Sequence, residues 1–302
     1  MGRCVRFGVV GAGIFGNFHA NKCAENSMID FIGVYDLDKA SAFAVAQKHN
    51  VTAFETYDDM LEDVEAVIIA CAAQNHAAMS LEALKSGKHC LIEKPLAADL
   101  ESAQKILDLS QNAKLIVQAG HQERFVMKAI GLDKVPEIPI SIQASRMSAY
   151  NSRGTDVSVT LDLMSHDLDL VLWLLGAFPN KITATTEIIK STTIDKCHVK
   201  LEFPKGFAEL TSSRVSDSSK RCMEIEYPSG KVYIDFNAKT VQHDTPFDLD
   251  SDFAQNPIAR DSLGAATDSF VKSILQATPI AITAQNGYDA VKLAVLIDQA
   301  GM

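Results

Sequence analysis

The pattern of hydrophobic and polar positions changes after Gly120. Up to that point, short apolar runs alternate with amphipathic stretches, as is typical of a parallel sheet covered by helices. The apolar runs predict strands at Val5–Val10, Ile29–Tyr35, Ala66–Ala70, Cys90–Ile92 and Leu115–Ala119. The amphipathic stretches predict helices at Ser41–His49, His76–Lys85 and Asp99–Ser110.

After Gly120, runs rich in β-branched residues follow one another with short turns, which predicts a mostly antiparallel sheet. These strands are expected at Ile138–Met147, Lys181–Ile189, Cys197–Phe203, Ala208–Ser213, Met223–Tyr227 and Lys231–Phe236. Helical spacing of apolar residues predicts two helices, at Leu161–Leu175 and Tyr288–Ala300. We therefore predict an α/β protein of two domains, a doubly wound parallel domain over residues 1–120 and an α+β domain over residues 121–302.

A glycine turn lies between the first predicted strand and the helix after it. Its sequence is G-A-G-I-F-G, from Gly11 to Gly16. Gly11 allows the tight turn, Gly13 lets the backbone approach a pyrophosphate, and Gly16 allows the helix to pack closely on the strand. The first helical residues, Ile14 and Phe15, add backbone N–H groups and the positive end of the helix dipole. The arrangement predicts a dinucleotide site.

The second predicted strand ends at Asp36, twenty residues after Gly16. A carboxylate at this distance hydrogen-bonds the adenosine ribose hydroxyls of NAD and repels the 2′-phosphate of NADP. Leu37 does not supply the positive charge that an NADP site needs, although Lys39 lies close enough to keep NADP open as the alternative. The sequence favours NAD as the cofactor.

The composition of the chain limits the kinds of molecule that it is expected to bind. The chain has 302 residues, 47% hydrophobic and 22% charged, with a net charge of −10. This balance argues against binding to nucleic acid or to an anionic membrane surface. No apolar run reaches the roughly 18–20 residues of a membrane-spanning helix, and the N-terminus lacks a signal-peptide pattern. The six cysteines are scattered, which predicts reduced thiols, no metal site and a cytoplasmic protein.

Glu93-Lys94-Pro95 directly follows the strand predicted at Cys90–Ile92. Residues just past the carboxyl ends of parallel strands face the ligand crevice of such a sheet. A lysine there can hydrogen-bond a substrate hydroxyl or act in proton transfer. The alternative is an ordinary solvated loop between strand and helix.

Three segments together resemble a known family. They are Gly11–Gly16, the run A-L-K-S-G-K-H from Ala83 to His89, and Glu93-Lys94-Pro95. The chain is similar in them to the glucose–fructose oxidoreductase/inositol dehydrogenase (Gfo/Idh/MocA) family. The resemblance implies a Rossmann domain followed by an α/β domain on a large antiparallel sheet, and oxidation or reduction of a sugar or cyclitol hydroxyl with NAD(P). It also implies a dimer or tetramer.

The resemblance also assigns residues to the cofactor side of the site. It implies that Glu93, Lys94 and His76 lie near the cofactor, with Lys94 polarising the reacting hydroxyl. The chain departs from the family after the fourth strand, where Cys71-Ala72-Ala73 stands in place of the usual Thr-Pro-Asn. Contacts near the nicotinamide made by the missing Thr and Asn are therefore in question.

Three polar residues, Asp162, His166 and Asp169, share one face of the helix predicted at Leu161–Leu175. By pattern alone such a face is either solvated or part of a site. The family carries an Asp-x-x-x-His pair on this helix, so the resemblance implies that His166 takes the hydroxyl proton and that Asp162 orients it or contacts the hydroxyl. A histidine suits this task because its ordinary pKa is near 6.5. Asp169 is expected to be a structural hydrogen-bond acceptor.

Arginines are concentrated between Arg124 and Arg153 in this acidic chain, and the planar guanidinium suits phosphate. The motif around Arg124, then Arg146 and Arg153, resembles a narrower group, the UDP-N-acetylglucosamine 3-dehydrogenases. That likeness makes four residues candidates to hold a nucleotide sugar: Arg124, Arg146, Tyr150 and Arg153. They can equally be ordinary surface residues.

Two other functions stay open at this point. The first is a dehydrogenase of a free sugar or a cyclitol such as inositol, for which the arginines would be dispensable. The second is a non-catalytic NAD-sensing regulatory protein, since fold alone does not prove catalysis. The joint presence of Lys94, Asp162 and His166 favours an enzyme.

Overall fold

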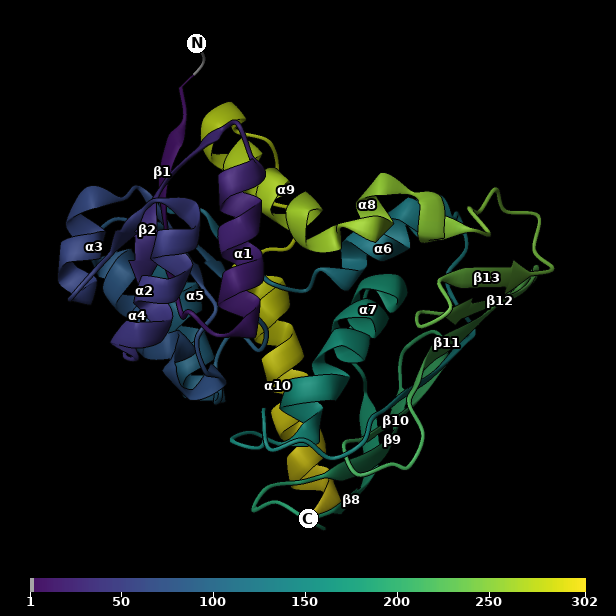
Figure 1. Ribbon diagram of the computed structural model, residues 1–302. Coiled ribbons are helices and arrows are strands. Elements are labelled where there is room, and N and C mark those ends of the chain that lie inside the picture. The colour runs from purple at the N-terminus through teal and green to yellow at the C-terminus, as the bar shows by residue number, and fades with distance from the viewer. Residues whose placement is uncertain (1–2) are drawn as a thin grey trace. The chain divides into compact units, whose positions relative to one another are not determined.

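The computed structural model describes residues 3–302, which form two compact units (Figure 1). The first unit contains the chain up to His121 together with Leu263–Tyr288. The second contains Gln122–Ser262 together with Asp289–Met302. The sequence pattern places a single boundary near residue 120, whereas in the structure a later segment returns to the first unit.

The first unit is built on a six-stranded, all-parallel sheet with the order β3-β2-β1-β4-β5-β6. Its strands are β1 (Val5–Val10), β2 (Ile29–Tyr35), β3 (Thr52–Ala53), β4 (Ala66–Ile69), β5 (His89–Ile92) and β6 (Val117–Ala119). The helices between them are α1 (Ile14–Glu25), α2 (Lys39–His49), α3 (Tyr57–Asp63), α4 (Ala73–Lys85) and α5 (Leu100–Ala113). This is the doubly wound order, and the predicted fold class is confirmed.

The central strands are apolar because both faces of the sheet are covered. All four residues of β4 are buried, as are Phe7 and Val9 of β1. Helix α9 (Ser262–Gln276) supplies part of this cover, since the Phe270 ring meets Phe7 edge-on at 5.7 Å between centroids. This contact explains why a segment far along the chain belongs to the first unit.

The second unit is built on a seven-stranded sheet with the order β13-β12-β11-β7-β10-β9-β8. Its strands are β7 (Ser141–Met147), β8 (Lys181–Glu187), β9 (Lys196–Glu202), β10 (Phe207–Ser213), β11 (Lys220–Tyr227), β12 (Gly230–Asp235) and β13 (Thr240–His243). Every neighbouring pair is antiparallel except β7 and β10. The prediction of a mostly antiparallel sheet is confirmed.

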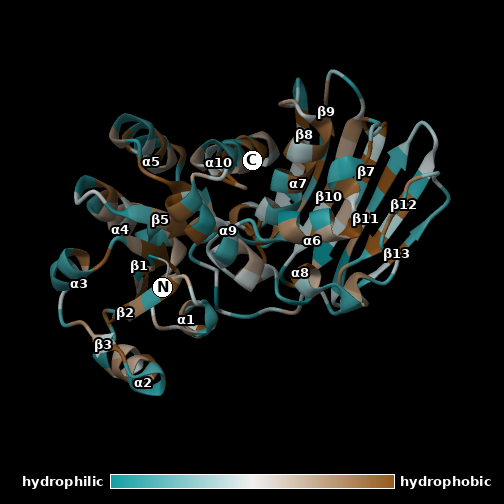
Figure 2. Cartoon of the chain, turned by 90° about the horizontal axis from the view of Figure 1, so that it is seen from above, coloured by the Kyte–Doolittle hydropathy of each residue, from teal (hydrophilic) through white to brown (hydrophobic). Residues whose placement is uncertain are grey.

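Burial alternates along these strands with the period of two that a sheet with one covered face requires. In β9, Cys197, Val199 and Leu201 are buried, whereas His198 and Lys200 are exposed. In Figure 2, brown and teal alternate along the strands of this sheet. The six predicted strands correspond to β7 through β12, with bounds that differ by at most three residues.

The helices of the second unit include one that differs in kind from the prediction. They are α6 (Glu123–Ile130), α7 (Ser165–Leu175), α8 (Pro257–Arg260) and the last part of α10 (Ala284–Gly301), with short 3₁₀ turns at Leu132–Lys134 and Phe253–Gln255. The helix predicted at Leu161–Leu175 begins as a π-helix, Thr160–Met164, and continues as α7. The wide π turn carries Asp162, and α7 begins one residue before His166.

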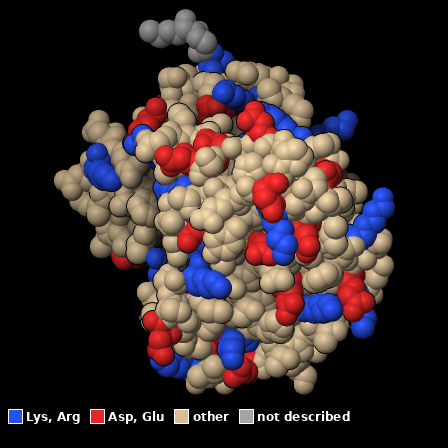
Figure 3. Space-filling view, turned by 90° about the vertical axis from the view of Figure 1, so that its right-hand side faces the viewer, with Lys and Arg blue, Asp and Glu red and all other residues tan. Residues whose placement is uncertain are grey.

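Within residues 3–302, no helix is both long and apolar enough to cross a bilayer. On the face drawn in Figure 3, basic and acidic side chains are interspersed and separated by uncharged surface. That face has no continuous basic stripe of the kind that binds nucleic acid.

Candidate active site

The glycine turn has the geometry that a dinucleotide site needs. Gly11 has a φ of +101°, and its N–H donates to the carbonyl of Tyr35 at 2.8 Å. A Cβ on Gly16 would lie 1.8 Å from the Gly11 carbonyl oxygen, so α1 and the turn are in close contact. A Cβ on Gly13 would meet nothing within 4 Å, which leaves the backbone open to a ligand. The backbone geometry of the three glycines is thus compatible with the predicted dinucleotide site, whose contacts stay a prediction.

The first turn of α1 is left without a side-chain cap. Helices α2 and α5 are capped by the carboxylates of Asp38 and Asp99, whereas α1 begins at Gly13, which has no side chain to offer. Ile14 in this first turn is 56% exposed although it is apolar. A helix N-terminus without a side-chain cap, beside an open apolar side chain, fits a bound pyrophosphate.

Asp36 lies at the same turn, as its spacing predicts. Its carboxylate accepts the N–H of Ala12 at 2.5 Å and that of Asp38 at 2.8 Å. Lys39, the residue that kept NADP open, is engaged elsewhere. Its ammonium donates to the backbone carbonyl of Glu55 and lies 4.7 Å from the centre of the Tyr35 ring. The charge nearest the turn is therefore negative, which fits NAD.

Glu93 and Lys94 follow β5 at the carboxyl edge of the parallel sheet, the edge that also carries the glycine turn. Glu93 is buried and pairs with His19 Nε2 at 2.8 Å. Burial by itself raises the pKa of Glu93, but the hydrogen bond and charge of His19, with the charge of Lys94, lower it on balance. Lys94 is half-buried and precedes Pro95 through a cis peptide bond. Glu93 is thus an internal anion that fixes the start of the loop carrying Lys94.

His76 joins two loops at this edge. Its Nδ1 lies 2.7 Å from the carbonyl oxygen of Pro95, and its Nε2 lies 3.1 Å from that of Cys71. The ring is buried, and burial lowers its pKa, so the neutral imidazole donates one of these two bonds. Helix α4 begins after Ala72, which provides no side-chain cap. His76 therefore positions the Pro95 loop, and its predicted place near the cofactor stays a prediction.

In the second unit, the π turn that carries Asp162 is anchored from several sides. Thr160 donates to the carboxylate of Asp298 on α10, and Ser158 lies 2.6 Å from the Thr160 hydroxyl. Gly154, with a φ of +74°, lies against Asp162, and a Cβ there would be 2.6 Å from Oδ2. π turns within helices occur frequently at functional sites. This one sets Asp162 beside a loop backbone.

His166 faces a buried carboxylate. Its Nδ1 lies 3.4 Å from Glu123 Oε1, and the His166 side chain is 12% exposed. Glu123 also accepts hydrogen bonds from Arg146, at 2.8 and 3.0 Å, and from Arg221. Burial on its own raises the pKa of Glu123, but the charges of Arg146, His166 and Arg221 hold that pKa well below its usual value. An ionised carboxylate opposite Nδ1 favours the tautomer with its proton on Nδ1 and its lone pair on Nε2.

Two of the arginines proposed for substrate binding are buried ion-pair partners instead. Arg124 donates to both oxygens of Asp169, at 2.6 and 2.7 Å, and Arg146 does the same to Asp167 in addition to Glu123. Both arginines are 6% exposed. A guanidinium paired in this way is not available to a phosphate, so the substrate interpretation of these two residues gives way to a structural one. Asp169 is the structural acceptor that the sequence predicts.

Tyr150 and Arg153 remain on the surface of the second unit. Tyr150 is 39% exposed, and the ammonium of Lys190 lies 5.6 Å from the centre of its ring. Arg153 is exposed, and its backbone N–H is held by Asn151 at 2.9 Å. These two candidates keep the exposure that a substrate contact requires.

Sequence reasoning missed several residues that shape this region. They are Glu123, Asp167, Lys190, Asp195, Arg214 and Arg221. The only sequence signal for Glu123 was its position next to Arg124, in a motif that we interpreted through the arginine alone. Asp195 and Arg214 lie far apart from each other in sequence and have no motif, so only the folded chain pairs them.

Comparisons with known proteins agree with this architecture. Residues 5–121 match the oxidoreductase family with an NAD-binding Rossmann fold, and residues 137–233 match the GFO/IDH/MocA C-terminal domain. A UDP-N-acetylglucosamine 3-dehydrogenase from Acidithiobacillus ferrooxidans is 32% identical over 286 residues, which is 91% of this chain and 90% of that protein. A solved structure of the enzyme from that organism has a TM-score of 0.89 at 30% identity and covers 98% of this chain and 97% of its own.

An inositol 2-dehydrogenase from Agrobacterium fabrum is also similar, at 30% identity over 214 residues, 67% of this chain and 62% of that protein. Both relatives are named as dehydrogenases, and the expectations of an NAD-dependent dehydrogenase and of NAD as its cofactor are confirmed. The glycine turn, the Glu93-Lys94-Pro95 loop and the two sheets thus have one explanation: the chain belongs to the Gfo/Idh/MocA family of NAD-binding oxidoreductases.

Proposed function

We propose that this protein oxidises the 3-hydroxyl of a UDP-N-acetylglucosamine-like nucleotide sugar to a ketone. The observation that carries the proposal is the buried Glu123 that orients His166 beside Asp162, on a chain similar over 91% of its length to a UDP-N-acetylglucosamine 3-dehydrogenase. A base of defined tautomer is what removal of a hydroxyl proton requires.

The chemistry divides between the cofactor and the side chains. Bound NAD supplies the hydride acceptor, held by Gly11–Gly16 with the ribose hydroxyls on Asp36. His166 Nε2 accepts the proton of the sugar hydroxyl, and a hydride leaves the carbon that bears this hydroxyl. A C=O bond thereby replaces the C–H and O–H bonds. Lys94 donates a hydrogen bond to that oxygen, and Asp162 holds the hydroxyl in place.

The remaining contacts concern the substrate's nucleotide. We propose that Tyr150 and Arg153 bind the nucleotide. Both are exposed in the second unit, and both precede Gly154, which lies against Asp162. An aromatic ring suits the base, and a guanidinium suits the diphosphate.

The test is direct. The purified protein with NAD should form NADH when UDP-N-acetylglucosamine is added, and Lys94→Ala should lose most of this turnover. If NADH forms with inositol or free N-acetylglucosamine and not with the nucleotide sugar, the substrate assignment is wrong. If Lys94→Ala is as fast as wild type, the role of Lys94 is wrong.

Two alternatives are tested by the same assay. A cyclitol or free-sugar dehydrogenase is favoured by the similarity to inositol 2-dehydrogenases. It predicts that Arg153→Ala keeps full turnover. A regulatory protein predicts NAD binding by calorimetry without turnover of any sugar, but it gives no reason for the orientation of His166 by Glu123.

We further propose a cytoplasmic protein that assembles as a dimer or tetramer. All six cysteines are free thiols in the structure, which fits a reducing compartment. One face of β8 and β9 is exposed, and it is the surface we propose for contact with a second copy. Light scattering on the purified protein measures the assembly, and a monomer would refute it.

A further inference from the structure

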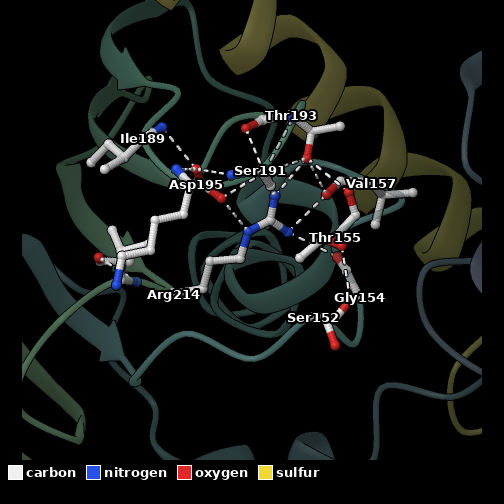
Figure 4. A network of polar contacts seen from close by, with 12 residues as sticks. Ser152, Gly154, Thr155, Val157, Ile189, Ser191, Thr193, Asp195 and Arg214 are labelled. Atoms are coloured by element: carbon white, nitrogen blue, oxygen red, sulfur yellow. Dashed lines mark hydrogen bonds and ion pairs between the residues drawn. The ribbon is translucent and has the colours of Figure 1, made fainter.

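A buried ion pair holds together two loops of the second unit (Figure 4). Arg214 donates to Asp195 Oδ1 at 2.8 Å, and both side chains are at most 3% exposed. Burial on its own raises the pKa of Asp195, but hydrogen bonds from Ser191, Arg214 and the backbone lower it well below its usual value. The pair is therefore charged, and it lies between the loops rather than on the surface.

Asp195 fixes the loop between β8 and β9. Its Oδ2 accepts the backbone N–H groups of three successive residues, Ile189, Lys190 and Ser191, at 2.6 to 2.9 Å. A segment held by three charge-assisted hydrogen bonds has little freedom to move. The side chain of Lys190 projects from this fixed backbone and is exposed.

Arg214 fixes the second loop, which runs from Tyr150 to Val157. Its Nη1 donates to the carbonyl oxygens of Gly154, at 2.8 Å, and Val157, at 2.9 Å. Thr193 adds a hydroxyl bond to Val157 at 3.0 Å, so the two loops are also joined directly. Gly154, in the middle of this loop, lies against Asp162, and Tyr150 stands at the start of the loop.

The two loops bring a cation and an aromatic ring together at one place. The Lys190 ammonium lies 5.6 Å from the centre of the Tyr150 ring. Gly154, which contacts Asp162, is four positions after Tyr150, so the Cα atoms of these two residues are at most about 14 Å apart. A diphosphate and a ribose can bridge such a length.

We propose that Lys190 is a specificity residue that binds the diphosphate of the nucleotide sugar, and that Arg214 and Asp195 are the positioning residues that hold it beside Tyr150. This rests on the proposed function, whose substrate it makes more specific. An exposed lysine over a ring is only weakly stabilised by that contact. The buried scaffold beneath Lys190 is what distinguishes it from an ordinary surface pair.

The experiment measures binding, so it does not depend on turnover. Calorimetric titration of the NAD-loaded protein with UDP should give binding that Lys190→Ala weakens about tenfold or more, the effect of one charge-assisted hydrogen bond. Lys190→Arg should bind UDP as tightly as wild type to within about threefold. Titration with uridine should not distinguish the variants, because uridine lacks the phosphates.

A matched control is available in the same unit. Lys200 is also exposed and lies 5.2 Å from the centre of an aromatic ring, that of Phe207, but it stands on β9 with no contact to the scaffold recorded in the described residues. Lys200→Ala should bind UDP like wild type. Equal losses from Lys190→Ala and Lys200→Ala would overturn the inference, because the effect would then be general charge.

The outcomes also separate this inference from the proposed function. If wild type does not bind UDP at millimolar concentration, or if Lys190→Ala binds it unchanged, the inference is wrong. If UDP binds through Lys190 but UDP-N-acetylglucosamine is not oxidised, the inference stands and the proposed reaction is wrong.

Discussion

The substitution Glu123→Gln tests how the second unit holds its catalytic base. The carboxylate of Glu123 is 3% exposed and accepts from Arg146, whose side chain is 8% exposed, and from Arg221. Glutamine has the same shape but no charge, so it leaves Arg146 with Asp167 as its sole anionic partner among those observed in residues 3–302. The change removes charge with little change in packing volume.

The loss of stability expected for Glu123→Gln follows from the burial of the ion pair. Removing one partner of a buried ion pair costs about 3–5 kcal/mol, because the other charge is left uncompensated. Asp167 still binds Arg146 at 2.7 Å, and the glutamine oxygen still accepts a hydrogen bond, so we expect the lower end of this range, about 3 kcal/mol. Urea unfolding followed by circular dichroism measures the change.

The same substitution should slow catalysis. Without the negative charge opposite Nδ1, His166 loses the interaction that fixes its tautomer and stabilises its protonated form. We expect kcat to fall about 10²-fold, the contribution of a positioned base, and the acid limb of the pH–rate profile to move to lower pH. KM for the nucleotide sugar should change little, since Glu123 is buried beneath the site residue.

Glu209→Gln is the matched control. Glu209 also faces a histidine, with 3.1 Å between its Oε1 and His198 Nε2, but it is 42% exposed on the outer face of the sheet. Such a pair contributes at most about 1 kcal/mol. If both glutamine variants lose the same stability, or if Glu123→Gln keeps wild-type kcat, the assignment of Glu123 as the residue that orients His166 is refuted.

Three further predictions follow from other parts of the structure. Asp36→Ser should weaken NAD binding about tenfold by fluorescence titration and reduce the preference over NADP; an unchanged ratio of the two affinities would contradict the role of this carboxylate. Gly154→Ala should lower kcat because its Cβ would displace Asp162, and it should cost about 1–3 kcal/mol of stability because a φ of +74° is strained for alanine; wild-type kcat would show that the contact is unimportant. Because the pKa of Asp195 is lowered in the folded state, its ionisation stabilises the fold above about pH 4, and this stability is lost as the pH falls through the folded-state pKa. Asp195→Asn should therefore be less stable at neutral pH, and its free energy of unfolding in urea should depend less on pH in acid. If the pH dependence is the same as in wild type, Asp195 does not contribute to the acid sensitivity.

Local sequence signals predicted the cofactor half of the site well. The glycine turn and Asp36 depend on a few residues close in sequence, and glycine has few reasons to recur at this spacing other than backbone geometry. The apolar runs of β1, β2 and β4 reported burial on both faces of a parallel sheet. In the second unit, consecutive β-branched runs joined by short turns predicted the mostly antiparallel sheet.

The signals failed where one residue type serves two purposes. An arginine that binds phosphate and an arginine that pairs with a buried carboxylate look alike in sequence, so Arg124 and Arg146 were assigned to the substrate. Asp169 was expected to be a structural acceptor, but no sequence signal linked it to Arg124 or linked Asp167 to Arg146. Helical periodicity also does not distinguish a π turn from an α turn, and Asp162 stands in one.

The sequence by itself determined the βαβ unit, its carboxylate and hence the binding of a dinucleotide, because these are properties of a short stretch of backbone. Only the tertiary structure decided what surrounds the candidate base: the ionised Glu123 opposite His166, the anchoring of the π turn by Asp298, and the pairing of Asp195 with Arg214. The physical reason is that the partner of a buried charge is selected by proximity in the fold. Sequence separation carries no record of it.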